Sequence, residues 1–294
     1  MRRTVFLATV AGAASAVLIP CALPAASLAD RIDDIVASGS GTFGIFARTM
    51  APGPALFSLR AYESFPCAST IKVLVMTTAF YTAETKRGVL AERITFHRDA
   101  LIGGSDHMAN VPDGTRLRVG DLIAPMILVS DNTAANMLIE HFGVGLINGV
   151  GREAGMLDTH LARPFIDTPY PILHEPNVTT PYDMGTLLYE IEYGAREAVR
   201  TIVSPEHCRR MIALMLAQQD RDKIPAGLPP GVPVADKDGE IDGTRDDAGI
   251  VEPFGDSPFV LSIYSKDVGD YDACLRTIRR IARATYDAVA GSDL

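Results

Sequence analysis

The stretch C-A-S-T-I-K-V-L-V-M-T-T-A-F-Y, residues 67–81, joins a pair of reactive side chains to a long apolar run. The run is longer than an ordinary strand and predicts a buried helix. Ser69 and Lys72 are three residues apart, and on a helix such residues share a face. A serine hydroxyl is a weak nucleophile that needs a neighbouring base, and a lysine can be that base if burial or other cations lower its pKa. The stretch therefore predicts a nucleophile and its base on one buried helix.

Two further polar motifs follow in the chain. S-D-N at residues 130–132 interrupts an apolar segment, and K-D-G at residues 237–239 lies on a predicted strand. Taken alone, S-D-N could be a helix N-cap, because all three residue types cap helices. The order S-x-x-K, S-x-N, K-[ST]-G is that of class A β-lactamases and penicillin-binding proteins.

The rest of the chain predicts strands near both ends with helices between them. Apolar stretches at 44–47 and 55–59 flank A-P-G-P and predict a β-hairpin, and further strands are expected at 232–237, 248–251 and 259–264. Helices are expected at 205–219 and 271–290. The proline-containing stretch 160–181 has little periodicity, and such a long loop is usually functional. The pattern indicates one sheet built from both termini plus a helical insertion.

Between about residues 40 and 290 the chain resembles the class A β-lactamase family of penicillin-recognising serine hydrolases. The resembling segments are F-P-C-A-S-T-I-K-V-L, D-L-I-A-P-M-I-L-V-S-D-N-T-A-A-N-M-L, T-T-P-Y-D-M and D-K-D-G-E-I-D-G-T-R-D-D-A-G-I-V. The resemblance implies an α/β fold of the α+β sandwich type. A five-stranded antiparallel sheet from both termini would be flanked by helices, with an all-helical subdomain inserted at about 72–205.

The resemblance also implies roles for the motif residues. Ser69 would be acylated, Lys72 would help to deprotonate it, and Ser130 would pass a proton to the leaving nitrogen. The Lys237 ammonium would hold the Ser130 hydroxyl. Asn132 would bond the acyl side-chain amide, whereas Asp131 is expected to be a structural acceptor. The remaining predicted substrate-binding residues are Asp238, Gly239, Glu240 and Arg245, with the backbone N–H groups of Ser69 and Glu240 forming the oxyanion hole.

Two positions depart from the family pattern. Phe165 falls where the family carries the glutamate that activates water for deacylation, and Asp167 and Glu175 are the nearest candidate bases. Asp238 stands where the family has a threonine or serine that meets the carboxylate of penicillin. Either the site is retuned for a neutral or cationic group, or Asp238 turns away or pairs with Lys237 or Arg245. Arg245 is either an anion anchor or a neutralising partner for the nearby acids.

The first 29 residues predict an export signal. They combine a basic M-R-R start, an apolar run ending at Pro20, and small residues at Ser27 and Ala29. A membrane anchor is the alternative, but glycine, serine and two prolines make the run a poor spanning helix. We expect a periplasmic or secreted protein with one domain, residues 30–294. Arg2 and Arg3 are compatible with twin-arginine export, and no stable membrane association is expected after removal of the segment.

Composition narrows the class of partner. The chain has 294 residues and a net charge of −9, which disfavours nucleic acid and anionic membranes. Cys67, Cys208 and Cys274 allow at most one disulfide, and Cys67 is expected to be a buried free thiol. The cysteine and histidine spacing predicts no metal site, and the chemistry needs no cofactor.

The predicted function is therefore that of an exported serine hydrolase opening a small-molecule amide, lactam or ester through an acyl-enzyme. One alternative is a penicillin-binding protein or sensor that is acylated but deacylates slowly. The other is a D-Ala-D-Ala carboxypeptidase, whose substrate ends in a carboxylate that the acidic third motif would oppose.

Overall fold

A five-stranded antiparallel sheet forms the centre of the protein. The computed structural model describes residues 27–165 and 176–291. The strands are β1 (Thr42–Thr49), β2 (Phe57–Leu59), β7 (Val234–Ile241), β8 (Thr244–Val251) and β9 (Phe259–Lys266), in the order β2-β1-β9-β8-β7. Both ends of the chain contribute strands, as predicted. The expected hairpin is confirmed, since Ala47 pairs with Phe57.

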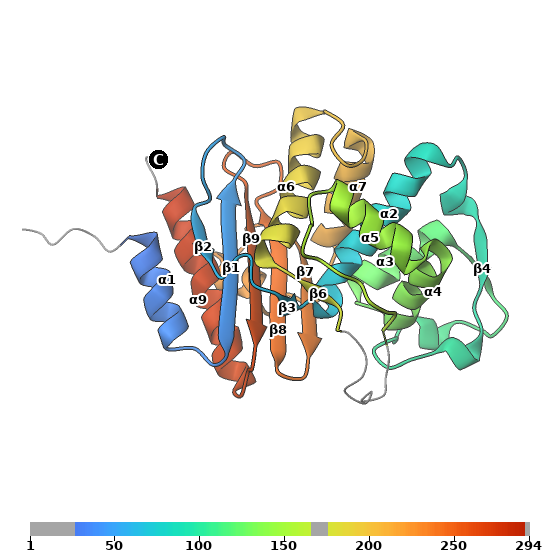
Figure 1. Cartoon of the computed structure of the whole chain (residues 1–294), viewed down its shortest axis with the longest axis horizontal. Helices are drawn as coiled ribbons and strands as arrows, with labels where there is room; N and C mark the ends of the chain where they lie inside the picture. The colour runs from blue at the N-terminus through green and yellow to red at the C-terminus, as the bar shows by residue number, and fades with distance from the viewer. Residues whose placement is uncertain (1–26, 166–175, 292–294) are drawn as a thin grey trace, which may run out of the picture.

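Helices from the two ends of the described chain cover one face of the sheet (Figure 1). These are α1 (Leu28–Ala37), α8 (Ile224–Gly227) and α9 (Tyr271–Ala290), the last matching the predicted helix 271–290. Ser27 caps α1 by accepting a hydrogen bond from the Asp30 amide, and the Asp30 side chain accepts from the Ser27 amide in return. Residues 1–26 of the predicted signal segment lie outside the described residues. Its last three residues are the N-cap Ser27 and the first two residues of α1, Leu28 and Ala29.

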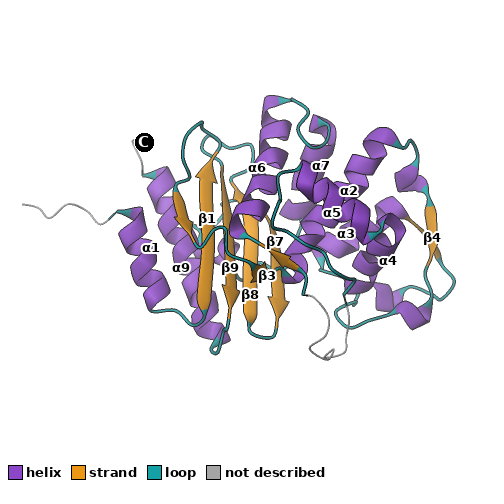
Figure 2. Cartoon of the chain, in the orientation of Figure 1, coloured by secondary structure: helices purple, strands orange, loops and turns teal. Residues whose placement is uncertain are grey.

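A larger group of helices packs on the other face (Figure 2). Helices α6 (Pro181–Glu197) and α7 (Pro205–Leu216) contact the sheet directly. The other helices of this group are α2 (Lys72–Thr85), α3 (Val119–Leu128), α4 (Asn132–Phe142) and α5 (Val144–Glu153). The first nine residues of α2 are all buried, which explains why the sequence there shows an unbroken apolar run.

Short elements connect these helices and lead into the site. They are the 3₁₀ turns η1 (Ala68–Ile71), η2 (Val89–Ala91), η3 (Arg98–Ala100) and η4 (Met108–Asn110), and the two-stranded ribbons β3 (Phe65–Pro66) with β6 (Val178–Thr179) and β4 (Arg93–Thr95) with β5 (Arg116–Arg118).

The three cysteines within the described residues, Cys67, Cys208 and Cys274, are free and buried. No disulfide forms among them, and the expectation for Cys67 is confirmed. None of the helices in the described ranges combines the length and apolarity needed to cross a membrane.

Candidate active site

Ser69 and Lys72 meet at the junction between η1 and α2. Ser69 lies in the 3₁₀ turn, and Lys72 is the first residue of the α-helix. In a 3₁₀ turn, side chains three residues apart are eclipsed, which brings Lys72 Nζ to 2.9 Å from Ser69 Oγ. The Thr70 hydroxyl closes the turn by donating to the Cys67 carbonyl at 2.6 Å. The predicted nucleophile and base are therefore in hydrogen-bonding contact.

The Lys72 amine is surrounded by oxygen atoms. Its Nζ lies 2.6 Å from Ser130 O, 3.0 Å from Ser130 Oγ and 2.7 Å from Asn132 Oδ1. Burial and the charge of Lys237 hold the pKa of Lys72 well below its ordinary value, against the opposing effect of Asp238. A neutral amine has two N–H groups, and Ser130 O and Asn132 Oδ1 can only accept them. Its lone pair is then left for a hydroxyl proton, which is what a general base requires.

S-D-N forms the turn between α3 and α4. Ser130 has a φ of 57°, a left-handed conformation, and both its carbonyl and hydroxyl oxygens lie within hydrogen-bonding distance of Lys72. The fully buried Asp131 accepts from the amides of Ala134 and Met108, each at 2.9 Å. Asp131 is thus the N-cap of α4, as its predicted structural role requires. Asn132 Nδ2 donates to Gly103 O at 2.8 Å, which fixes the amide beside Lys72.

Strand β7 passes close behind the nucleophile. A Cβ atom on Gly239 would lie 2.9 Å from Ala68 Cβ and 3.1 Å from Ser69 N. Such distances leave no room for a side chain, so glycine allows the strand to approach η1. The oxyanion-hole assignment of Ser69 and Glu240 remains a prediction.

Lys237 has different partners from those predicted. It is fully buried, and its ammonium donates to Asp238 O at 3.0 Å and to the Asp238 carboxylate. Among the described residues the hydrogen bonds of the Lys237 ammonium go to Asp238, so the expected contact with the Ser130 hydroxyl is not made in this structure. The cause is the nearby Asp238 carboxylate, which a threonine or serine would not offer.

A cavity of about 220 Å³ opens beside Ser69. Its other lining residues are Gly104, Val129, Ser130, Asn132, Asp220, Asp238 and Glu240. Asp238 was expected either to face the substrate, to turn away, or to pair with Lys237 or Arg245. The structure shows that it pairs with Lys237 and that it also lines the cavity. The pocket thus combines the predicted nucleophile with three carboxylates.

Arg245 lies on the margin of the site. Its Nη1 donates to Ile241 O at 3.0 Å and Thr244 O at 2.7 Å, and its guanidinium stacks 3.8 Å from the Tyr271 ring. Arg245 Nε is 3.6 Å from Glu240 Oε1. These contacts support the role of Arg245 as a neutralising partner for Glu240. Arg245 is not among the residues that line the cavity.

Lys223 is a site residue that sequence reasoning missed. Its side chain is 1% exposed, and its Nζ lies near four carboxylates: Asp222 at 3.0 Å, Asp220 at 3.4 Å, Asp238 at 3.6 Å and Glu240 at 2.8 Å. These carboxylates outweigh burial and raise its pKa. In the sequence, D-R-D-K at 220–223 resembles an exposed charged turn, and no local pattern indicates that its lysine is buried.

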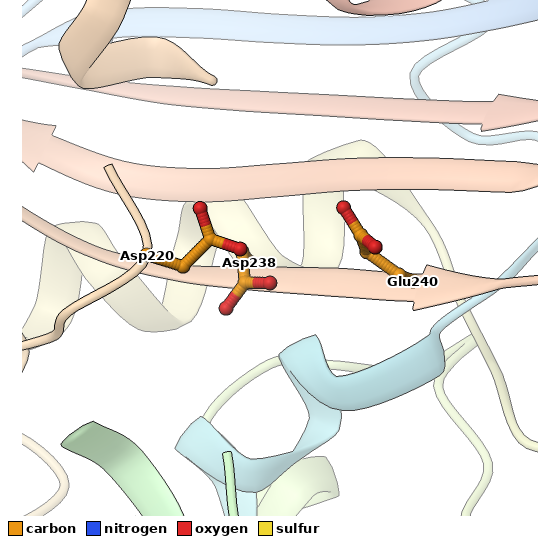
Figure 3. A group of neighbouring side chains, drawn as sticks. All are labelled: Asp220, Asp238 and Glu240. Carbon is orange, nitrogen blue, oxygen red and sulfur yellow. The ribbon is translucent and has the colours of Figure 1, made fainter. Parts of the chain in front are cut away.

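Asp220, Asp238 and Glu240 also have the spacing of a cation site, with their oxygen atoms within 4.8 Å of one another. Figure 3 shows Asp238 and Glu240 on β7 and Asp220 on the neighbouring segment. The Lys223 ammonium contacts all three carboxylates. The protein therefore supplies its own cation to this cluster.

Phe165 packs against the base. Its ring centroid lies 4.6 Å from Lys72 Nζ. The Asn136 side chain holds the Phe165 backbone on both sides, accepting from its amide at 2.7 Å and donating to its carbonyl at 2.8 Å. The candidate deacylation bases Asp167 and Glu175 lie outside the described residues.

The fold and this constellation define a serine hydrolase of the class A β-lactamase type. The chain belongs to the β-lactamase enzyme family, whose model matches residues 27–289. It is 26% identical to β-lactamase CTX-M-25 of Escherichia coli over 271 residues, 90% of this chain and 89% of that protein.

Solved structures agree with this assignment. The β-lactamase of Sphaerobacter thermophilus matches with a TM-score of 0.80 at 27% identity, covering 91% of this chain and 98% of that chain. PBP-A, solved as a mutant in an acyl-enzyme complex with penicillin G, matches with a TM-score of 0.78 at 27% identity, covering 90% of this chain and 97% of that chain.

Proposed function

We propose that the protein is an exported hydrolase that opens an amide, lactam or ester bond through an acyl-enzyme on Ser69. The contact of 2.9 Å between Ser69 Oγ and Lys72 Nζ carries this proposal. As Ser69 Oγ bonds to the substrate carbonyl carbon, its proton passes to the neutral Lys72 amine. The Ser130 hydroxyl, 3.0 Å from Lys72 Nζ, then gives a proton to the leaving nitrogen or oxygen and takes one from Lys72.

Phe165 favours a second candidate function, that of a protein which is acylated but releases the acyl group slowly. Hydrolysis of the acyl-enzyme needs a base to take a proton from water, and general-base catalysis contributes about 10²–10⁴ in rate. An aromatic ring cannot accept that proton, and it covers the Lys72 amine at 4.6 Å. The acyl-enzyme solved for PBP-A supports such an adduct in this fold.

Mass spectrometry of the intact protein over time tests both functions. We expect benzylpenicillin methyl ester to add the mass of one molecule to the wild type and nothing to the Ser69→Ala variant. Phe165→Glu should shorten the life of the adduct by about 10²–10⁴, because it places a carboxylate beside the acyl group. Phe165→Leu is the control without a base.

Two results would contradict these functions. An adduct on Ser69→Ala, or a wild type that neither forms an adduct nor consumes the ester, would remove Ser69 from the role of nucleophile. Equal adduct lifetimes in Phe165→Glu and Phe165→Leu would show that Phe165 does not occupy the position from which water is activated.

A further inference from the structure

We infer that the Asp238 carboxylate is a built-in ligand for two buried ammonium groups beside Ser69, and that it selects uncharged or cationic substrates over those with a carboxylate. This inference rests on the proposed function, because it names the substrate class of the Ser69 site. Asp238 acts as a specificity-determining residue.

The first step is the environment of the Asp238 side chain. Its carboxylate contacts the Lys237 ammonium through Oδ1, and its Oδ2 lies 3.6 Å from Lys223 Nζ. The buried Gln218 amide donates to Oδ1 at 3.0 Å and fixes the orientation of the carboxylate. Both lysines are almost completely shielded from water, at 0% and 1% exposure. Two cations thus converge on one internal anion.

The second step is the position of this anion relative to the reaction. Asp238 lines the cavity of about 220 Å³ together with Ser69 and Ser130. It also lines an adjoining cavity of about 310 Å³ with Leu128, Val129, Ser130, Gln219 and Asp220. A substrate bound with its carbonyl at Ser69 would therefore extend along Asp238. A negatively charged group there would meet a carboxylate in the place where the two ammonium groups could otherwise have held it.

The third step is the charge of the rim. Asp220 and Glu240 line the same cavity, and their side chains are 43% and 41% exposed. With Asp222 and Asp238, they place four carboxylates around Lys223, whereas among the described residues Lys237 forms its ion pair with Asp238. Arg245 lies 3.6 Å from Glu240 and adds a third cation to the two ammonium groups. The four carboxylates still outnumber these three cations, so the mouth of the cavity repels anions and attracts cations.

A pair of ligands that differ by one charge and one methyl group tests the substrate class. We expect benzylpenicillin methyl ester to acylate the wild type at least about tenfold faster than benzylpenicillin does. Asp238→Asn keeps the shape but removes the charge, and should abolish or reverse this preference. Asp222→Asn is the matched control, because it removes a carboxylate from Lys223 that does not line the cavity, and the preference should remain. Equal rates for the two ligands on the wild type, or an unchanged preference in Asp238→Asn, would overturn the inference.

A second measurement does not depend on acylation. In Asp238→Ala the Lys237 ammonium loses its carboxylate partner, whereas Lys223 keeps Asp220, Asp222 and Glu240. Acetate should therefore raise the thermal midpoint of this variant and leave those of the wild type and Asp222→Ala unchanged. If Asp238→Ala does not fold, Asp238→Asn, which also removes the carboxylate partner of Lys237, is tested with acetate in its place. Acetate that stabilises every variant alike, or none, would overturn the inference. Failure of both penicillins to acylate the wild type would contradict the proposed function alone, because the acetate result would still decide the role of Asp238.

Discussion

At the scale of single residues, the proposed chemistry depends on an amine that gives up its proton more easily than an ordinary lysine. Burial and the positive charge of Lys237 hold the pKa of Lys72 well below its ordinary value. The acceptors Ser130 O and Asn132 Oδ1 then fix its two N–H groups. Loss of the lowered pKa or of these two acceptors should impair proton transfer from Ser69 to Lys72.

The pH dependence of acylation tests this role. Because the pKa of Lys72 is held well below its ordinary value of 10.5, the acylation rate should rise with pH and reach its plateau well below 10.5. Lys72→Arg is charged at all accessible pH values and should lower the rate by about 10²–10⁴. A wild-type rate that keeps rising about tenfold per pH unit as far as the ordinary lysine pKa would contradict a base with a lowered pKa.

At the scale of elements, the nucleophile is held by the contact between β7 and η1. This contact depends on Gly239, since a Cβ there would lie 2.9 Å from Ala68 Cβ and 3.1 Å from Ser69 N. The strand therefore sets the position of the Ser69 backbone, from which the oxyanion hole is predicted to form.

Gly239→Ala should force these elements apart. We expect it to lower the free energy of unfolding by about 1–3 kcal/mol, as overpacking does, and to slow acylation. Gly149→Ala in α5 is the control, because nothing lies within 4 Å of its Cβ position; it should be neutral or stabilising by up to ~1 kcal/mol. Urea unfolding and acylation rates measure both effects. Equal stability and activity of the two variants would disprove the close approach.

At the scale of the whole molecule, the sheet contains three fully buried aspartate side chains. Asp236 on β7 and Asp246 and Asp247 on β8 are fully buried, and burial raises the pKa of each. The pKa of Asp247 is raised to about 7, chiefly by burial and against the charge of Lys223. Stability should therefore depend on pH.

The sign follows from proton binding. Between the ordinary Asp value of 3.8 and about 7, the folded protein holds a proton on Asp247 that the unfolded chain releases, so the free energy of unfolding should fall as pH rises through this window. Asp247→Asn should flatten this dependence by on the order of 4 kcal/mol across the window. Urea unfolding at several pH values measures it, with the exposed Asp256→Asn as control. A slope that Asp247→Asn leaves unaltered would contradict the assignment.

Much of this architecture was predictable because its signals are local. Ser69 and Lys72 are three residues apart, S-D-N is contiguous, and the strands and α9 follow from apolar patterns. Lys223 was not predictable, because its burial depends on how the segment before α8 packs beside β7. Pairing of Lys237 with Asp238 was one of the predicted alternatives, but the predicted contact of Lys237 with the Ser130 hydroxyl is not made. A long, flexible lysine stem lets the ammonium turn to the carboxylate of its own neighbour in the chain. Such choices are made by three-dimensional packing.

The left-handed backbone of Ser130 determines which substitutions this position tolerates. Threonine carries the same hydroxyl and would rank among the mildest replacements by chemical similarity. At a φ of 57°, however, a β-branched residue is strained, whereas glycine adopts this conformation without steric strain. The Ser130 carbonyl that receives the Lys72 amine depends on this backbone as much as the hydroxyl does. The turn can therefore lose the hydroxyl without strain but cannot easily gain one methyl group. Stereochemistry excludes threonine, and the proposed proton transfer by the hydroxyl excludes glycine.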